Sequence, residues 1–148
     1  MLALDTNLLL YSVDSDAGSK HQDALQFVTL AGRSGAAVLT EQNLIEFMHA
    51  SLRKRLRPLA EAADSVRKWM AVFRIIVPDG TIVARTIYLL ENHRLSVWDA
   101  RLLATCASND CNLLLSEDLQ DGALYGTVRV LNPLNPANAD IIREALAQ

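Results

Sequence analysis

The chain of 148 residues has little of several features that would place it in other protein classes. Its only cysteines are Cys106 and Cys111 and its three histidines are scattered, which excludes a disulfide framework and the usual structural zinc spacings. Aromatic residues make up 5% of the chain, and the dominance of leucine and alanine favours helices packed on a small sheet over a β-sandwich. No glycine- or proline-rich linker divides the sequence, so we expect a single domain over residues 1–148.

Long apolar runs and a strong net charge are also missing. No stretch approaches the roughly 18 apolar residues of a membrane span, and residues 1–4 do not resemble a signal peptide, so we expect a cytoplasmic protein with no membrane partner. The net charge of −3 argues against binding nucleic acid through bulk positive charge, but it allows a nuclease whose carboxylates are neutralised by a metal ion. Basic residues concentrate only within residues 53–68, where a solvated helix end is favoured over a nucleic-acid contact.

Short apolar runs alternate with helical patterns. Runs of strand length occur at residues 2–4, 37–40, 75–77, 113–115 and 128–131. Helical spacing of apolar side chains covers residues 19–32, 41–54, 59–73, 81–93, 96–107 and 137–148. The segment 8–13 fits either a helix or a strand. This alternation predicts an α/β fold with a mostly parallel, five-stranded sheet that helices cover on both sides.

The first and fourth apolar runs end in the same way. The first stops at Asp5 and Thr6, and the fourth stops at Ser116, Glu117 and Asp118. In a parallel sheet both ends lie at the same edge, where ligands collect in open α/β folds, so the two aspartates would meet if the strands are neighbours. The alternative is that Asp5 and Thr6 cap the next helix, and this stretch alone favours the cap.

Two further acidic residues lie on helical segments. On a helical wheel the apolar residues of 41–54 fall within an arc of about 160°, and Glu46 lies opposite, which predicts a solvent-facing side chain. Ser96 and Asp99 form a capping-box pattern. However, Asp99 also heads an apolar stripe, where a carboxylate is costly without a compensating partner. Asp99 is therefore either a cap or a site residue, and by position alone it would lie at the opposite sheet edge unless its helix docks with its start over the crevice.

These acidic residues resemble, in order and spacing, those of the PIN-domain family. The motifs are Asp5-Thr6-Asn7, Asn43-Leu44-Ile45-Glu46, Ser96-Val97-Trp98-Asp99-Ala100 and Leu115-Ser116-Glu117-Asp118. The resemblance covers essentially the whole chain, whose length is similar to that of VapC-type toxins of bacterial toxin–antitoxin pairs. It implies a three-layer α/β/α fold in which four acidic residues converge on Mg²⁺ or Mn²⁺ and single-stranded or loop RNA is hydrolysed.

Carried over to this sequence, the resemblance implies a specific set of site residues. The catalytic acidic residues would be Asp5, Glu46, Asp99 and Asp118. The metal ligands would come from Asp5, Asp99, Asp118 and Asp121, and whether Asp118 or Asp121 is the fourth acidic residue stays open. Thr6, Asn7 and Ser116 would orient carboxylates or the scissile phosphate.

The residue types suit metal-assisted hydrolysis. Two like charges at about 4 Å repel by on the order of 4 kcal/mol at an effective dielectric constant of about 20, so several carboxylates need a divalent cation to stay ionised together. Oxygen ligands favour Mg²⁺ or Mn²⁺ over zinc. We expect water to be the nucleophile, because no serine, cysteine or histidine arrangement for covalent catalysis is apparent, and His21, His49 and His93 are expected in surface or packing roles.

The expected partners are an RNA substrate, a cognate antitoxin and a second copy of the chain, the last through the helices of residues 41–73. Three other functions remain open: a PIN-like RNA-processing or nucleic-acid-binding module that is not a toxin, a non-catalytic binding module whose acidic residues are caps, and a phosphotransfer or phosphatase-type α/β domain. The last fits poorly, because a phosphatase of this kind needs a second aspartate where Asn7 stands, and a receiver domain needs a late lysine although none follows Lys68.

Overall fold

In the computed structural model, which describes residues 1–147, short strands alternate with helices. The strands are β1 (Leu2–Leu4), β2 (Ala37–Thr40), β3 (Arg74–Ile76), β4 (Leu113–Leu115), β5 (Leu124–Tyr125) and β6 (Val128–Leu131). The helices are α1 (Thr6–Val13), α2 (Ser19–Ser34), α3 (Glu41–Arg53), α4 (Leu59–Val72), α5 (Ile82–Asn92), α6 (Val97–Ser108) and α7 (Ala139–Leu146), with 3₁₀ turns η1 (Ser15–Ala17) and η2 (Pro136–Asn138). The last predicted helix was expected to reach Gln148, which lies outside the described residues. Across residues 1–147, no helix is both long and apolar enough to cross a membrane.

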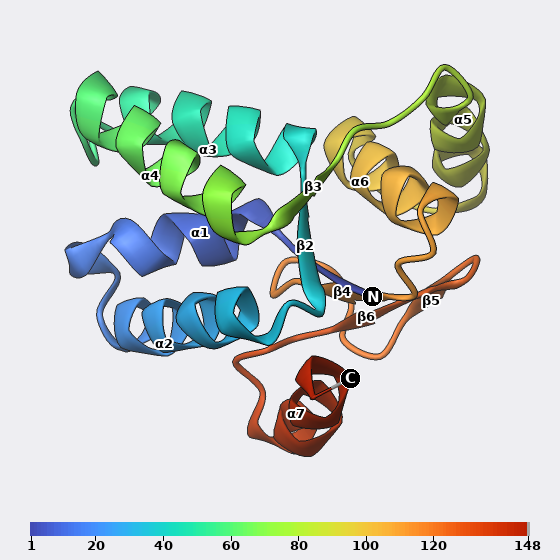
Figure 1. The fold of residues 1–148 in the computed structure, drawn as a ribbon. Coiled ribbons are helices and arrows are strands. Elements are labelled where there is room, and N and C mark those ends of the chain that lie inside the picture. Colours follow the sequence, from blue (N-terminus) through green and yellow to red (C-terminus); the bar gives the residue numbers. More distant parts are fainter. Residues whose placement is uncertain (148) are drawn as a thin grey trace.

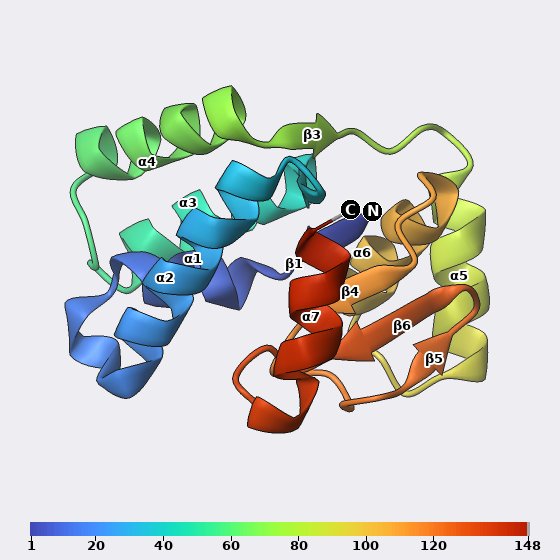
Figure 2. The ribbon, with the colours of Figure 1, turned by 60° about the horizontal axis from the view of Figure 1, so that its bottom comes forward.

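The strands form one sheet in the order β3-β2-β1-β4-β6-β5. All neighbouring strands are parallel except β5 and β6, which pair as an antiparallel hairpin at one edge of the sheet (Figure 2). The prediction of five strands was therefore wrong by one. The missed strand, β5, has only two residues, and the positive φ of +63° at Gly126 supports the tight turn that pairs it with β6. So short a strand leaves no apolar run in the sequence.

Helices cover both faces of the sheet, and the three-layer α/β/α fold is confirmed. Because successive strand residues point to opposite faces, Leu2 and Leu4 pack with α1, α2, α3 and α7, while Ala3 packs with α5 and α6. Figure 1 shows this arrangement, with α1 to α4 on one side of the strands and α5 and α6 on the other. The continuous burial of β1 and β4 on both faces is typical of the central strands of a parallel sheet.

The topology brings three chain segments to the carboxyl edge of the sheet. β1 and β4 are neighbours, as the shared edge of Asp5 and Asp118 required. Four residues separate the end of α6 from the start of β4, and the helix runs back along this strand, so its first turn lies at the carboxyl edge and its last turn at the opposite edge. The position of Asp99 deduced from chain order alone was therefore wrong, because a helix that feeds a strand starts at the edge where that strand ends.

The start of α3 lies at the same edge, directly after β2. Thr40 caps the helix through a capping box: its hydroxyl accepts from the Asn43 backbone N–H at 3.2 Å, and the Asn43 side chain accepts from the Thr40 backbone N–H at 2.8 Å. Both residues are fully buried. The capping box therefore fixes the direction in which α3 leaves the sheet.

Candidate active site

A pocket of about 820 Å³ opens at the carboxyl edge of the sheet, and five carboxylates line it: Glu41 at the start of α3 and four others, each from a different segment. Asp5 follows β1, Glu46 lies on α3, Asp99 lies in the first turn of α6, and Asp118 lies on the loop after β4. Residues that are up to 113 positions apart in the sequence therefore meet at one site through the sheet topology. The pocket also contains Thr6 and Asn7.

Asp5 is the buried member of this group, with 9% of its surface exposed. It is the N-cap of α1, because its carboxylate accepts from the backbone N–H of Thr6 at 2.6 Å, and it also accepts from the Ser116 hydroxyl at 2.6 Å. Burial raises the pKa of Asp5 to about 6, against the lowering effect of these two hydrogen bonds; the nearby charges of Asp118 and Asp99 raise it further. Asp5 is thus a cap and also a carboxylate whose ionisation is disfavoured until a cation approaches.

Glu46 is held by two donors and is partly buried. Its carboxylate accepts from the Thr6 hydroxyl at 2.8 Å and from the Gln42 side-chain amide at 3.0 Å. The Thr6 hydroxyl in turn accepts from the buried Asn43 side chain at 3.2 Å. The wheel prediction of a solvent-facing Glu46 was wrong: Ile45, assigned to the apolar face, is 59% exposed, and the helix is rotated so that Glu46 faces the pocket.

The loop after β4 presents Asp118 to the pocket. Asp118 is exposed; its carboxylate accepts from the Asn7 side-chain amide, and its backbone N–H donates to the Ser116 hydroxyl at 3.3 Å. The neighbouring Glu117 points to the other side, where it accepts from the Tyr11 hydroxyl and forms an ion pair with Lys20 at 2.9 Å. Ser116 and Asn7 therefore each contact a pocket carboxylate, while Glu117 anchors the loop.

Asp99 bonds to the capping residue Ser96 and also lines the pocket. It is the third residue of α6, its backbone N–H donates to the Ser96 hydroxyl at 3.1 Å, and the same hydroxyl donates to its carboxylate at 2.6 Å. The carboxylate is partly exposed and lines the pocket. Capping and a position in the pocket are therefore compatible.

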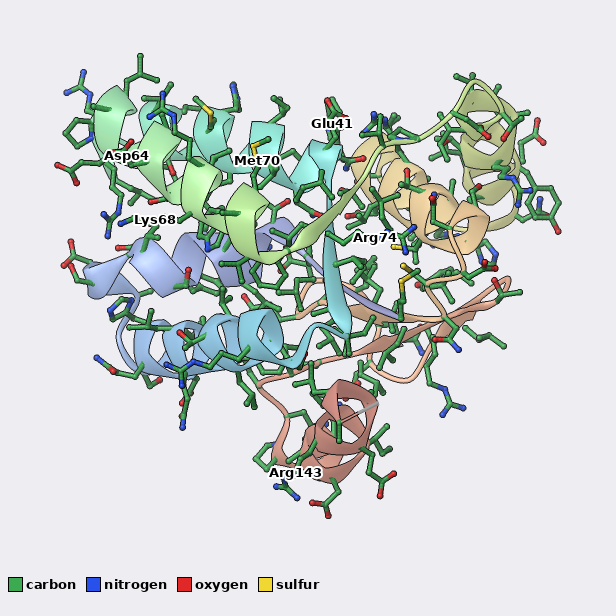
Figure 3. The ribbon with its side chains drawn as sticks, viewed as in Figure 1. Glu41, Asp64, Lys68, Met70, Arg74 and Arg143 are labelled. Carbon is green, nitrogen blue, oxygen red and sulfur yellow. The ribbon has the colours of Figure 1, made fainter. Side chains whose placement is uncertain are left out.

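Sequence reasoning missed Gln42, which joins the two helices of the site. Its side chain is 3% exposed, and its amide nitrogen donates to Glu46 and, at 2.9 Å, to the backbone carbonyl of Trp98. Its amide oxygen accepts from Arg101 at 2.7 Å, and Arg101 also pairs with Glu41 at 3.2 Å. Figure 3 shows Glu41 at the end of α3 that lies next to α6. The available signal was the i, i+4 spacing of Gln42 and Glu46, which places them side by side on the helix.

Asp121 lies outside the residues that line the pocket. Its carboxylate accepts from the Asn132 backbone N–H at 2.9 Å and from the side-chain amides of Asn135 and Asn138 at 2.7 and 2.9 Å. The hydrogen bond from Asn132 is the main cause of a lowered pKa of Asp121, and that from Asn135 adds to it. This carboxylate therefore joins the loop after β4 to the segment after β6.

The pocket residues fit a hard divalent cation by chemistry. Within residues 1–147, no group of three or more acidic, histidine or cysteine side chains is arranged so that it could hold a metal ion. Mg²⁺ does not require such a group, because it keeps several waters and takes one or two carboxylates from the protein. The oxygen-only donors and the suppressed ionisation of Asp5 both suit such an ion.

The sequence profile of the PIN domain matches residues 2–120. The chain belongs to the PIN-domain family. This membership implies a nuclease, that is, a hydrolase of phosphodiester bonds. No curated protein matched the sequence closely enough to count as a relative.

Solved structures with the same fold as this PIN domain include a toxin–antitoxin complex from Klebsiella pneumoniae, with 21% identity, a TM-score of 0.64 and coverage of 90% of this chain and 98% of the other. VapC20 from Mycobacterium tuberculosis, a sarcin–ricin loop cleaving toxin, has 16% identity, a TM-score of 0.66 and coverage of 87% and 99%. VapBC2 from Rickettsia felis, bound to a promoter DNA fragment, has 10% identity, a TM-score of 0.66 and coverage of 88% and 97%. This PIN domain therefore has the fold of VapC-type proteins.

Proposed function

We propose that this PIN domain is a Mg²⁺- or Mn²⁺-dependent endoribonuclease that hydrolyses single-stranded or loop RNA. The observation that carries the proposal is the meeting of four carboxylates from four segments in one pocket: Asp5, Glu46, Asp99 and Asp118. A structural role for each as a cap or surface charge would not require them to converge. Their convergence leaves a concentration of negative charge that a divalent cation would offset.

The chain's own residues would prepare the site for hydrolysis. One or two of Asp5, Asp99 and Asp118 would contact the cation directly and the remainder through its bound waters, with Asp5 fixed by Ser116 and Asp118 fixed by Asn7. Glu46, held by Thr6, would accept a proton from the attacking water or orient that water. A bound divalent cation would supply charge neutralisation at the phosphate and a lowered pKa for water. Asp121 would act outside this group, since its oxygens already accept hydrogen bonds from three asparagines.

The proposal is tested by cleavage of a panel of single-stranded and structured RNAs by purified protein. We expect cleavage with Mg²⁺ or Mn²⁺, none with EDTA, and none with the Asp99→Asn variant. Asp121→Asn is the matched control, because it removes the same charge from a position outside the pocket and should retain cleavage. Cleavage that persists both in EDTA and in Asp99→Asn would refute the metal-dependent mechanism.

We also propose that the protein acts as the toxin of a toxin–antitoxin pair in the cytoplasm. The structures with the same fold include complexes of toxins with antitoxins. In this chain, α2 and α4 expose large apolar side chains that a protein partner would cover: Leu25, Leu30, Leu59, Met70 and Val72, between 43% and 57% exposed. A homodimer through α3 and α4 stays a prediction, which sedimentation analysis of the purified chain would test.

Growth measurements separate the toxin proposal from ribonuclease activity itself. Expression of the wild-type chain alone should arrest growth, expression of Asp99→Asn should not, and coexpression with a cognate antitoxin should restore growth. If RNA is cleaved in vitro while expression leaves growth unchanged, the chain is an RNA-processing nuclease and the toxin proposal is wrong.

A further inference from the structure

The acidic pocket extends along one whole side of α3. Its lining includes residues of successive helical turns: Gln42, Ile45, Glu46, His49, Arg53 and Lys54. With a rise of about 1.5 Å per residue, positions 42 to 54 span about 18 Å, which is long enough for several nucleotides of an extended strand. We refer to this feature as the α3 groove. Asp99 lines the part of the groove that lies at the start of α3.

The two ends of the α3 groove differ in chemistry. At the start of α3, the groove is lined by Trp98, whose side chain is 60% exposed, next to Asp99. At the end of α3 it is lined by Arg53 and Lys54, neither of which forms an ion pair within residues 1–147. The helix dipole alone accounts for basic residues at the end of α3. It does not account for the fact that both side chains line the same groove as the carboxylates. One end therefore offers an aromatic face and the other offers unpaired positive charge.

The exposure of Trp98 contrasts with the packing of Trp69, the only other tryptophan. Trp69 packs edge-on against Phe47 at 4.6 Å between ring centroids and lies, partly buried, against the core. Trp98 leaves a large aromatic surface in water, although its backbone is held firmly: it lies in the first turn of α6, and its carbonyl accepts from Gln42 at 2.9 Å. A fixed backbone beneath an exposed ring provides a preorganised surface for stacking.

We propose that Trp98 is the stacking platform for an unpaired RNA base next to the cleaved phosphate, and that the strand then follows the α3 groove with its phosphates directed toward Arg53 and Lys54. This inference rests on the proposed ribonuclease function and adds the way in which the substrate is held. Bases inside a duplex are stacked on each other and cannot lie on a side chain, so the platform selects unpaired nucleotides. The positive end supplies the salt-dependent part of the affinity.

Binding without cleavage tests the platform directly. In a Trp69→Phe background Trp98 is the sole tryptophan, and its fluorescence in EDTA should be quenched by a short single-stranded RNA of mixed sequence. Stacking of one base supports a loss of about 5- to 150-fold in affinity for Trp98→Ala, and Trp98→Phe should recover most of it. Duplex RNA of the same sequence should quench weakly, and single abasic sites scanned along the oligonucleotide should weaken binding at one position only.

The matched control is Tyr88→Ala, which removes an aromatic side chain of similar exposure, 62%, on α5 outside the α3 groove. It should leave RNA affinity unchanged. In cleavage assays, Trp98→Ala should raise KM more than it lowers kcat, because the stacked base contributes to binding before the chemical step. A lower salt dependence of binding in Arg53→Ala would support the proposed direction of the strand.

The outcomes separate this inference from the proposed function. If the wild type cleaves RNA with metal but Trp98→Ala binds and cleaves as well as Tyr88→Ala does, the platform is overturned and the ribonuclease stands. If Trp98 is quenched by single-stranded RNA and no metal produces cleavage, the platform stands and the ribonuclease is overturned. If Trp98→Ala weakens only self-association or antitoxin binding, Trp98 is a protein contact and the inference is wrong.

Discussion

Asp5 in the pocket and Asp121 on the loop after β4 each follow a buried apolar strand, but their side chains have opposite surroundings. Asp5 is 9% exposed, and burial raises its pKa to about 6. Asp121 is exposed, and its hydrogen bonds from Asn132 and Asn135 hold its pKa below the usual range. The charge of Asp5 is thus disfavoured by the fold, and the charge of Asp121 is stabilised by it.

This difference shows how two similar carboxylates acquire different roles. An exposed carboxylate whose charge is already stabilised by protein donors gains little from a cation and serves to hold a loop. A carboxylate buried near other negative charges gains much from a cation, because the cation removes the cost of ionisation. The surroundings, and not the residue type or its place after a strand, separate a candidate ligand from a structural side chain.

The largest effect is expected from neutralising each aspartate in turn. Asp5→Asn should reduce RNA cleavage by at least about 100-fold, because it removes a proposed ligand, whereas Asp121→Asn should stay within about 2-fold of the wild type. Initial rates at saturating Mn²⁺ on one RNA substrate provide the measurement. Equal losses in the two variants would remove the distinction drawn between these carboxylates.

The pH dependence of stability is the second expectation. Because the pKa of Asp5 rises from 3.8 in the unfolded chain to about 6 in the folded one, the native state binds more protons between these pH values, and stability falls as pH rises through this window. The loss is about 3 kcal/mol without metal. Urea unfolding in EDTA at a series of pH values should show it in the wild type. Asp5→Asn should lack this component of the slope, and Mg²⁺ should reduce it in the wild type.

Substitution of Gln42 tests whether Glu46 is a site carboxylate, like Asp5, or a structural one, like Asp121. Glu46 lies in the pocket, but both of its oxygens accept hydrogen bonds from protein donors. Gln42→Leu should lower kcat by about 10- to 100-fold, because Glu46 and the first turn of α6 lose their common support. Gln42→Glu keeps an acceptor for Arg101 but loses the donor to Glu46, so it should be impaired to a similar degree. A purely structural Gln42 would lower thermal stability and leave kcat of the folded fraction unchanged.

The smallest effect concerns the loop that Asp121 holds. Asp121→Ala should lower the free energy of unfolding by about 1 kcal/mol, because hydrogen bonds to an exposed carboxylate contribute modestly. Chemical denaturation would measure it, with Asp140→Ala on α7 as a control, where only an exposed ion pair with Arg143 is lost. A much larger loss in the free energy of unfolding would mean that the hydrogen bonds of Asp121 stabilise the sheet as well as the loop.

The sequence predicts the sheet well because its central strands are buried on both faces. The runs at 2–4, 37–40 and 113–115 coincide with strands whose residues are all buried, which leaves an uninterrupted signal. The run at 128–131 also coincides with a strand, although the exposed Arg129 interrupts it. β3 is shifted by one residue from the predicted 75–77, and Val77, which is 68% exposed, falls outside it. β5, at the edge of the sheet, has only two residues, one exposed and one partly buried, which is too few to show the alternation of a strand.

The candidate site was less accessible to pattern analysis for a different reason. A helical wheel divides α3 into an apolar and a polar face, but a groove along the helix needs partly exposed apolar residues and partly buried polar ones, as Ile45 and Glu46 are. Only the family resemblance pointed to Glu46. Gln42 had no such pointer, because its role depends on α6, a helix that is distant in sequence.

Trp98 and Asp99 are consecutive residues in one helical turn, and Gln42 holds the carbonyl between them. If RNA stacks on the first and the cation binds the second, both ligands act on the same rigid unit. Thermodynamic reciprocity then requires that any factor by which the cation tightens RNA binding is the factor by which RNA tightens cation binding. If the cation tightens RNA binding, the proposed metal site would therefore fill more readily when a substrate strand is already in place.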